Sequence, residues 1–260
     1  FTLAEAYRAE GRIEEAYETA KAGLAARPDY LQGRIAMADA LLDMGRHEEA
    51  RAAFEDILDD YPSDMTVLGK LGVFHYSVGE FDAAETKLSM AVAAKPDDVE
   101  AHWHLATLYL SQRRWNKGWG LYGWRWPMSK TVAQETMISL PKWTGENLSG
   151  KRIIIWGEQG LGDELMFATC VPDLLEKATP DLCVLACDQR LAAIFGRSFK
   201  DVHIQPMDRQ GNTHSSFQIP VCDVQIAAGD LPTILRLHDD DFPSVRCRLT
   251  PDPTRAARWR

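Results

Sequence analysis

Residues 157–164 contain the side chains of this sequence whose types and spacing could do chemistry. Three glycines alternate there with acids and one amide: Gly157, Glu158, Gln159, Gly160, Gly162, Asp163 and Glu164. The β-branched run Ile153–Ile155 comes before them, and a helix-like apolar stripe begins at Leu161. This pattern predicts a strand, a Gly-rich loop and the start of a helix. In an open α/β sheet such a loop binds ligands, because unsatisfied backbone N–H groups point into it.

Asp163 is the residue of this loop that could act as a catalytic base. Near a helix N-terminus its carboxylate would stay ionised and could accept a proton from a hydroxyl nucleophile. The position equally suits an ordinary N-cap aspartate, and the residues alone favour neither interpretation. The loop does not end in Gly-Lys-Ser/Thr, and its glycine spacing differs from Gly-x-Gly-x-x-Gly. These differences disfavour a Walker A nucleotide site and a dinucleotide-binding enzyme.

The composition of the chain disfavours some classes of binding partner and indicates its cellular compartment. The 260 residues have a formal net charge of −9, which disfavours nucleic acid or an anionic membrane as the main partner. The five cysteines lack a metal-ligand spacing, so a zinc site at Cys183 and Cys187 is disfavoured and a reduced, cytoplasmic protein without a metal or bound cofactor is expected. No apolar run reaches the roughly 20 residues of a membrane span. Phe1 falls inside a repeat, so we expect the sequence to be part of a longer protein.

Residues 1 to about 126 repeat with a period of 34. Pro28, Pro62 and Pro96 mark the period, and small residues recur at two positions that bring paired helices close: Ala4, Ala38, Gly72 and Ala106, and Ala16, Ala50, Ala84 and Gly118. Gly11, Gly45 and Gly79 are placed to end the first helix of a repeat, and Arg113 takes that position in the last. The period and these positions resemble the tetratricopeptide repeat, so we expect about four repeats, the first incomplete.

Such an array leaves a concave surface formed by the first helix of each repeat, which typically holds a polypeptide. We predict that Tyr76, Trp103, Thr107 and Leu110 line a groove for a protein acceptor. Exposed aromatic residues contribute much of the energy of such interfaces. Further concave positions are Glu5, Arg8, Asp39, Leu42, Asp43 and Val73. A solvated inner face is the alternative.

The last repeat and the segment after it differ from the earlier copies. Trp115, Trp119 and Tyr122 form one apolar stripe, which predicts packing against a following domain. Residues 127–150 show no sustained period and are expected to be a linker, fixed to the next domain by residues 141–143.

Residues 151–250 alternate predicted strands with predicted helices, which indicates a parallel sheet of Rossmann-like type. The strands are expected at 153–155, 182–186, 202–205 and 221–227, with helices at 189–199 and 231–237. Residues 251–260 are expected to begin a connector to a further domain. The fold class expected for the whole chain is α plus α/β: a helical-repeat array followed by a Rossmann-like parallel-sheet domain.

The loop Trp156–Glu164, together with Pro141-Lys-Trp143 and the repeats, resembles bacterial tetratricopeptide glycosyltransferases. Their relatives are the O-linked N-acetylglucosamine transferases and the heptosyltransferases, which have a two-domain GT-B fold. The resemblance implies an inverting transfer from a nucleotide sugar to a hydroxyl of a protein acceptor, flagellin in some members. Leu161-Gly162-Asp163 looks like the heptosyltransferase motif whose Asp is the proposed general base, so the resemblance assigns that role to Asp163.

Two departures from the family limit this assignment. The donor site of a GT-B enzyme lies mainly in its second domain, which would begin where this chain ends, so the chain alone is expected to be inactive. The repeats also lack the inner Asn ladder of the eukaryotic relatives, having no Asn before Asn116. Two hypotheses follow: the first part of a glycosyltransferase whose repeats recruit the acceptor, or a non-catalytic tetratricopeptide adaptor with a degenerate Rossmann-like domain.

Overall fold

The computed structural model describes residues 2–128, 139–158, 160–207, 220–243 and 249–258. The chain forms two compact units, Phe1–Leu108 and Tyr109–Arg260, and each is described here by itself. Within the described residues, no helix is long and apolar enough to cross a membrane.

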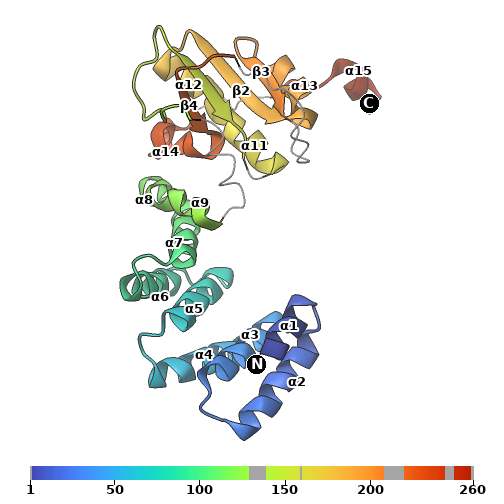
Figure 1. Ribbon diagram of the computed structural model, residues 1–260, viewed down its shortest axis with the longest axis vertical. Helices are drawn as coiled ribbons and strands as arrows, with labels where there is room; N and C mark the ends of the chain where they lie inside the picture. The colour runs from blue at the N-terminus through green and yellow to red at the C-terminus, as the bar shows by residue number, and fades with distance from the viewer. Residues whose placement is uncertain (1, 129–138, 159, 208–219, 244–248, 259–260) are drawn as a thin grey trace. The chain divides into compact units, whose positions relative to one another are not determined.

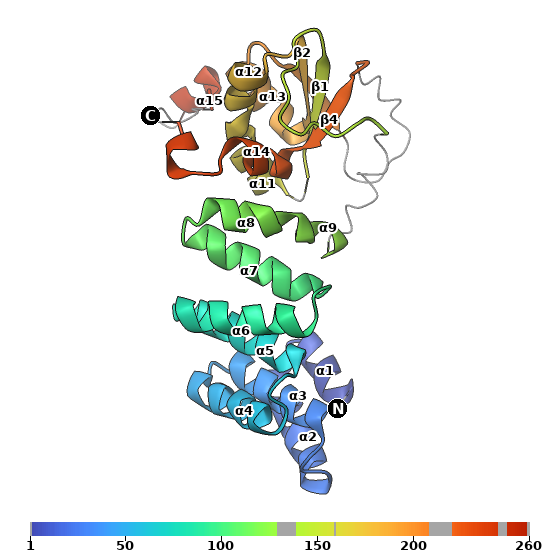
Figure 2. The ribbon, with the colours of Figure 1, turned by 90° about the vertical axis from the view of Figure 1, so that its left-hand side faces the viewer.

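The first unit is a run of antiparallel helix pairs (Figures 1 and 2). Helix α3 packs against both α2 and α4, and α5 packs against α6. The helices are α1 (Thr2–Ala9), α2 (Ile13–Ala26), α3 (Leu31–Asp43), α4 (His47–Asp60), α5 (Met65–Ser77), α6 (Phe81–Ala94) and α7 (Val99–Ser111), the last of which continues into the second unit. The predicted helical-repeat array is confirmed.

Small residues let paired helices approach closely, as their spacing predicts. Ala16, Ala38 and Ala50 are fully buried between helices. At Gly72 an added Cβ would lie 2.5 Å from Cγ of Leu88, so α5 and α6 touch where the sequence has no side chain. Phe54 and Phe74 are buried in one core cluster with Ala38 and Ala50.

The turn after the first helix of each repeat needs a left-handed residue. Gly11, Gly45 and Gly79 have φ angles of 74°, 72° and 82°. Arg113 takes the same place in the last repeat with φ 59°. For an L residue this conformation costs about 1–2 kcal/mol, whereas glycine adopts it freely. The fourth repeat therefore contains a strained backbone that the first three avoid.

The second unit begins with the last helices of the repeat array. Helix α8 (Trp115–Leu121), the 3-10 turn Tyr122–Trp124 and helix α9 (Arg125–Met128) belong to it. Tyr122 contacts Phe167, and Trp126 contacts Trp156, so these helices pack on the α/β part as the aromatic stripe predicts. The boundary between compact units consequently lies inside α7, and not in the expected linker.

The α/β part holds a four-stranded parallel sheet with the order β3-β2-β1-β4. Its strands are β1 (Arg152–Trp156), β2 (Leu182–Asp188), β3 (His203–Met207) and β4 (Val224–Ala227). Its α-helices are α11 (Leu161–Phe167), α12 (Val171–Ala178), α13 (Gln189–Ser198), α14 (Pro232–Leu235) and α15 (Pro253–Ala257). Short 3-10 turns cover Ala168–Cys170, Ala228–Asp230 and Asp239–Asp241.

Both faces of the sheet are covered, as parallel sheets require. Alternate strand residues point to opposite faces. Ile155 and Leu185 face Phe167 and Phe195, whose helices lie on that side. Trp126 and Leu140 pack against the opposite face, on residues that include Ile154, Trp156 and Val184.

The segment before β1 is fixed to the sheet as the sequence predicts. Lys142 pairs in parallel with Gln225 of β4, and Trp143 N–H donates to the Gln225 carbonyl at 2.8 Å. The Trp143 side chain is 1% exposed, and its indole Nε1 donates to the Glu146 carbonyl at 2.8 Å. This end of the linker therefore extends the sheet beyond β4.

Candidate functional site

The carboxyl ends of β1 and β4 form the expected ligand-binding edge. Strands β2 and β3 lie to one side of β1 and β4 to the other, so the strand order reverses between β1 and β4. In open α/β sheets ligands bind at this switch point, outside the carboxyl ends of the strands. The loop 157–160 follows β1, and the turn Ala228–Asp230 follows β4. Gln159 was predicted to belong to this site and lies outside the described residues.

Asp163 caps the start of α11. Its Oδ2 accepts a hydrogen bond from the backbone N–H of Gly160 at 3.1 Å, three residues earlier. Gly160 itself is extended, with φ −133° and ψ 174°, as the residue before a helix commonly is. The structure thus shows the capping role of Asp163 directly. Its role as a base remains a prediction.

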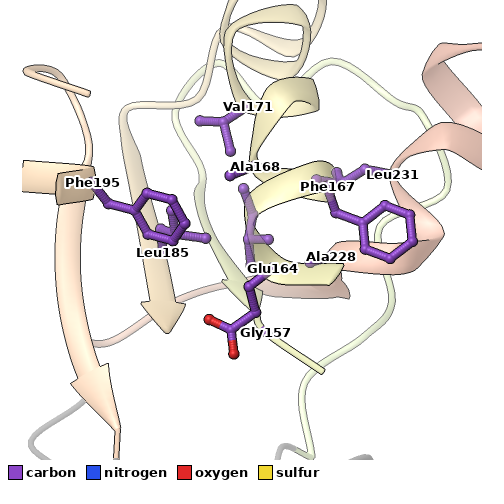
Figure 3. Close-up of a pocket in the computed structure, with 10 residues that line it drawn as sticks. Gly157, Glu164, Phe167, Ala168, Val171, Leu185, Phe195, Ala228 and Leu231 are labelled. Atoms are coloured by element: carbon purple, nitrogen blue, oxygen red, sulfur yellow. The ribbon is translucent and has the colours of Figure 1, made fainter. Parts of the chain in front are cut away.

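Glu164 is buried beside the loop. It is 2% exposed, and its Oε2 accepts the backbone N–H of Asp188 at 2.9 Å, at the carboxyl end of β2. Figure 3 shows its carboxylate extending toward Gly157, away from the apolar side chains of Phe167 and Leu231. A Cβ at Gly157 would lie 2.6 Å from Glu164 Cδ. Glycine is therefore required at 157 because a buried carboxylate occupies the adjoining space.

Glu158 forms the centre of a buried ion cluster. Arg125 Nε donates to Glu158 Oε2 at 2.9 Å, and Arg125 Nη2 donates to Oε1 at 2.7 Å. The same Nη2 donates to Asp230 at 2.6 Å, and Lys142 lies 2.5 Å from the other oxygen of Asp230. Gly229 N–H also donates to Glu158 at 2.8 Å. We call Arg125, Glu158 and Asp230 the buried triad.

The electrostatics of the buried triad favour its charged form. Arg125, Glu158 and Asp230 are 2%, 1% and 4% exposed. Burial alone would lower the pKa of Arg125, but hydrogen bonding to Glu158 and the charge of Asp230 raise it above its ordinary value. The guanidinium also lies 4.6 Å from the Tyr122 ring and 4.1 Å from the Trp126 ring, where the faces of two aromatic systems stabilise a cation.

Arg125 therefore occupies the switch point of the sheet. Its guanidinium joins Glu158, which follows β1, to Asp230, which follows β4. Glu158 and Glu164, two of the acids predicted to bind substrate, are buried and hydrogen-bonded within the protein. Asp163 and the exposed Gly162 lie at the outer side of the loop. Sequence reasoning missed Arg125 and Asp230, because neither belongs to a motif and their separations from Glu158 are 33 and 72 residues.

The repeat unit contains a second candidate site. A groove of about 410 Å³ is lined by residues from the first helices of successive repeats, which we call the repeat groove. Its lining residues are Arg8, Asp39, Leu42, Met65, Thr66, Gly69, Lys70, Val73, Asp98, Glu100, Ala101 and His104.

Charges in the repeat groove are fixed by one buried carboxylate. Asp39 accepts Arg8 Nη1 at 2.9 Å and Lys70 Nζ at 2.8 Å, and so links α1, α3 and α5. Arg8 Nε also donates to Asp43 at 2.6 Å. At the other end, burial lowers the pKa of His104, against the raising effect of Glu100 and Asp98. His104 is therefore neutral at neutral pH.

The residues predicted to bind the acceptor lie outside the repeat groove. Tyr76 is half-buried beside Phe81, and Trp103 is also half-buried. Thr107 donates from Oγ1 to the His104 carbonyl at 2.9 Å. Leu110 belongs to the second unit, where it packs against Gly118. Of the six further concave positions, Arg8, Asp39, Leu42 and Val73 line the groove, whereas Glu5 and Asp43 are not among its lining residues. The role of the four predicted residues stays a prediction.

A resident metal ion has no obvious ligands in the part of the chain that the structure describes. No group of three or more His, Cys, Asp or Glu side chains there could hold one. Cys183 and Cys187 are both buried in β2.

The repeats match a known family. Residues 35–98 and 75–117 match one sequence model of the tetratricopeptide repeat, and residues 1–22 match another. The tetratricopeptide character of the array is confirmed.

One curated relative aligns with nearly the whole chain. Protein FlbA of Caulobacter vibrioides is 30% identical over 269 residues, which cover 99% of this chain and 45% of FlbA. The chain thus spans less than half the length of that relative. Among solved structures, a tetratricopeptide protein of Thermus thermophilus is 25% identical with a TM-score of 0.46, over 52% of this chain and 75% of that one. Pseudomonas aeruginosa pilF is 17% identical with a TM-score of 0.46, over 50% and 60% of the two chains.

Proposed function

We propose that this chain is a tetratricopeptide adaptor whose repeat groove holds an extended or helical segment of a partner protein. The observation that supports this most is the groove itself, formed by the same face of successive repeat helices. Arrays of stacked helix pairs commonly use such concave surfaces to bind polypeptides. The interaction rests on the fold of the repeats and needs no reacting group.

The lining of the repeat groove suits a peptide chain. Leu42, Met65 and Val73 offer apolar contact from two neighbouring first helices. Arg8 and Lys70 are held in place by Asp39, with their side chains 27% and 32% exposed, so they can still donate to peptide carbonyls. Gly69 leaves open space within the groove, since an added Cβ there would meet no atom within 4 Å. A binding surface that is already ordered loses less entropy on binding.

The geometry of the β1 loop supports the adaptor over the enzyme. Glu158 and Glu164 are buried in contacts with Arg125 and Asp188, and Asp163 caps a helix. A loop whose acids already have protein partners is suited to hold the sheet and the last repeat together.

Photo-crosslinking from a single position tests the proposal. A photoreactive amino acid replaces Val73 in the groove, or Met90 as a control on α6, in the full-length protein in its own cells. Met90 is 42% exposed and does not line the groove. We expect one defined partner to crosslink from position 73 and not from 90. Equal products from both positions, or no defined product from position 73, would contradict the adaptor function.

Glycosyl transfer is the second candidate, supported by the parallel sheet with a Gly-rich turn after β1 and by Asp163 at the outer side of that turn. In this proposal the repeats recruit a protein acceptor, flagellin being the candidate that the family resemblance suggests. Asp163 would accept the proton of the acceptor hydroxyl, and a nucleotide sugar would serve as donor. The loop residues Gly157, Gly160 and Gly162 would lie beside the substrates.

The adaptor function and glycosyl transfer predict different effects of Asp163→Asn in the full-length protein. An asparagine keeps the size of the side chain and can still accept the Gly160 N–H bond through its carbonyl oxygen. Transfer of sugar that is present in the wild type and lost in Asp163→Asn, with unchanged melting temperature, would support the enzyme. Transfer that survives the substitution would exclude Asp163 as its base.

A further inference from the structure

The repeat groove belongs to a strongly acidic unit. Residues 1–108 contain 21 Asp and Glu side chains and 10 Lys and Arg side chains, which gives them a formal net charge of −11. Residues 109–260 contain 17 Asp and Glu and 19 Lys and Arg, a net charge of +2. Even if every Lys and Arg of the first unit formed an ion pair with one of its acids, 11 acids would be left over. The excess negative charge of the chain therefore lies in the unit that contains the groove.

The two cations that line the groove already bind acids of the same unit. Arg8 Nη1 and Lys70 Nζ both donate to Asp39 Oδ2, at 2.9 and 2.8 Å. Arg8 Nε donates to Asp43 at 2.6 Å. Asp39 is 6% exposed, and a buried carboxylate that loses its cations is costly. A carboxylate of a partner would compete with Asp39 for these donors, so the groove is unsuited to an acidic side chain or a C-terminal carboxylate.

Part of the groove lining is apolar. Leu42 lies on α3, and Met65 and Val73 lie on α5. An added Cβ at Gly69 would meet no atom within 4 Å, so there is room for a partner side chain above the backbone of α5. Burial of an apolar side chain in this space is favourable without any charged contact. These residues favour a partner segment that carries a large apolar side chain.

The remaining charges of the groove lining are negative. Glu100 is exposed and forms no ion pair among the described residues. Asp98 accepts the Ala101 N–H at 2.8 Å and lies 3.6 Å from Lys95. His104 adds no positive charge at neutral pH, because burial lowers its pKa. The lining thus contains three carboxylates and two cations, and its excess charge has the same sign as that of the whole unit.

We propose that the repeat groove binds a polypeptide segment in which a large apolar side chain is flanked by Lys or Arg. This assignment rests on the proposed adaptor function, whose partner it specifies by chemistry. The apolar side chain packs against Leu42 and Val73, and a basic side chain lies near Glu100. Further basic residues of the segment are attracted by the net charge of the unit. Such complementary charge speeds association and selects among partners, and salt screens it.

Selection from a library of random peptides displayed on phage tests this partner chemistry, with the whole 260-residue chain as the target. The variant is Glu100→Lys, and the matched control is Glu14→Lys. Glu14 is the second residue of α2, as Glu100 is of α7, and it is exposed and does not line the groove. Both substitutions change the net charge equally, so a difference between them reports the charge within the groove.

Peptides selected on the wild type should share a large apolar residue with Lys or Arg at a fixed spacing from it. Their affinity should fall as the salt concentration rises. They should bind Glu100→Lys about five-fold or more weakly than the wild type, since an attraction becomes a repulsion. Glu14→Lys should bind them nearly as tightly as the wild type. Melting temperatures of both variants report whether the fold is intact.

Gly69→Trp, which fills the groove, separates the charge preference from the adaptor function. Peptides that bind the wild type and not Gly69→Trp occupy the groove. If such peptides are rich in Asp and Glu, show no charge preference, or bind Glu100→Lys as tightly as the wild type, the basic segment is overturned while the groove stands as a polypeptide site. Selection of no peptide, or only of peptides that Gly69→Trp binds unchanged, would overturn both.

Discussion

The guanidinium of Arg125 donates to both carboxylate oxygens of Glu158, at 2.9 and 2.7 Å, in the interior of the second unit. Arg125 belongs to the last helix of the repeats, and Glu158 belongs to the loop after β1. The pair joins the end of the repeat array to the carboxyl edge of the sheet. The loop after β1, whose residue types could do chemistry, thus also connects the last helix of the repeats to the sheet.

Arg125→Met should destabilise the second unit by about 3–5 kcal/mol. The substitution leaves the carboxylates of Glu158 and Asp230 buried with Lys142 as the remaining nearby cation, and uncompensated buried charge is costly. Hydrogen exchange of the β1 and β4 amides, measured across a denaturant series, reports the change in the free energy of opening.

Arg152→Met is the matched control, since Arg152 pairs with Asp223 at the surface and its side chain is 42% exposed. Its protection factors should remain near those of the wild type. Equal losses in both variants would mean that the buried triad contributes no more than a surface pair.

Gly157→Ala and Gly162→Ala should have opposite effects on stability. The new methyl group at 157 would lie 2.6 Å from Glu164 Cδ, and that carboxylate is held by Asp188 N–H. Overpacking of this kind costs about 1–3 kcal/mol. At 162, inside α11, no atom lies within 4 Å of the added Cβ, and alanine favours helix over glycine by about 0.5–1 kcal/mol. Thermal unfolding measures the change in stability of both variants. A melting temperature that Gly157→Ala leaves unchanged would contradict the close contact between position 157 and Glu164.

A similar pair of substitutions tests the packing of α5 on α6. Gly72→Ala would bring a methyl group to 2.5 Å from Leu88 Cγ and 3.2 Å from its backbone nitrogen, so we expect a loss of about 1–3 kcal/mol. Gly69→Ala, one turn earlier in the same helix, meets no atom and should gain about 0.5–1 kcal/mol. Denaturant midpoints of the two variants should move in opposite directions from the wild type. Movement in the same direction would count against this packing.

Cys183 should resist alkylation while the protein is folded. Burial raises the pKa of its thiol to about 12, with a smaller contribution from Cys222. Because the thiolate is the reactive form, almost none is present at pH 8. Mass spectrometry after iodoacetamide treatment should find Cys183 unmodified in buffer and modified in denaturant. Rapid labelling in buffer would show that β2 opens locally.

The repeat array could be predicted from sequence because its determinants are local and recur. The period of 34, the small residues between helices and the glycines at 11, 45 and 79 each describe a contact within one or two repeats. The strands could also be predicted, since β-branched runs such as Ile153–Ile155 are buried on both faces. Pro172 follows Val171 in the first turn of α12, where a helix tolerates proline.

The buried triad and the ion pair of Arg113 with Asp239 could not be predicted in this way. Arg125 and Asp230 are 105 residues apart, and an arginine between two tryptophans gives no sign that it will be buried. Arg113 was noted only as a departure from glycine, because its partner Asp239 lies 126 residues further along the chain. The groove prediction selected aromatic residues, whereas packing between neighbouring helices leaves Tyr76 and Trp103 half-buried outside the groove.

The dissociation constant between the full-length protein and the partner crosslinked from position 73 tests the adaptor function most directly. Gly69→Trp fills the repeat groove, and Gly120→Trp places the same side chain on α8, where an added Cβ also meets no atom. Gly69→Trp should weaken binding by about ten-fold or more, equivalent to at least 1.4 kcal/mol, and Gly120→Trp should leave it unchanged. Equal affinity of both variants and the wild type would contradict binding in the groove.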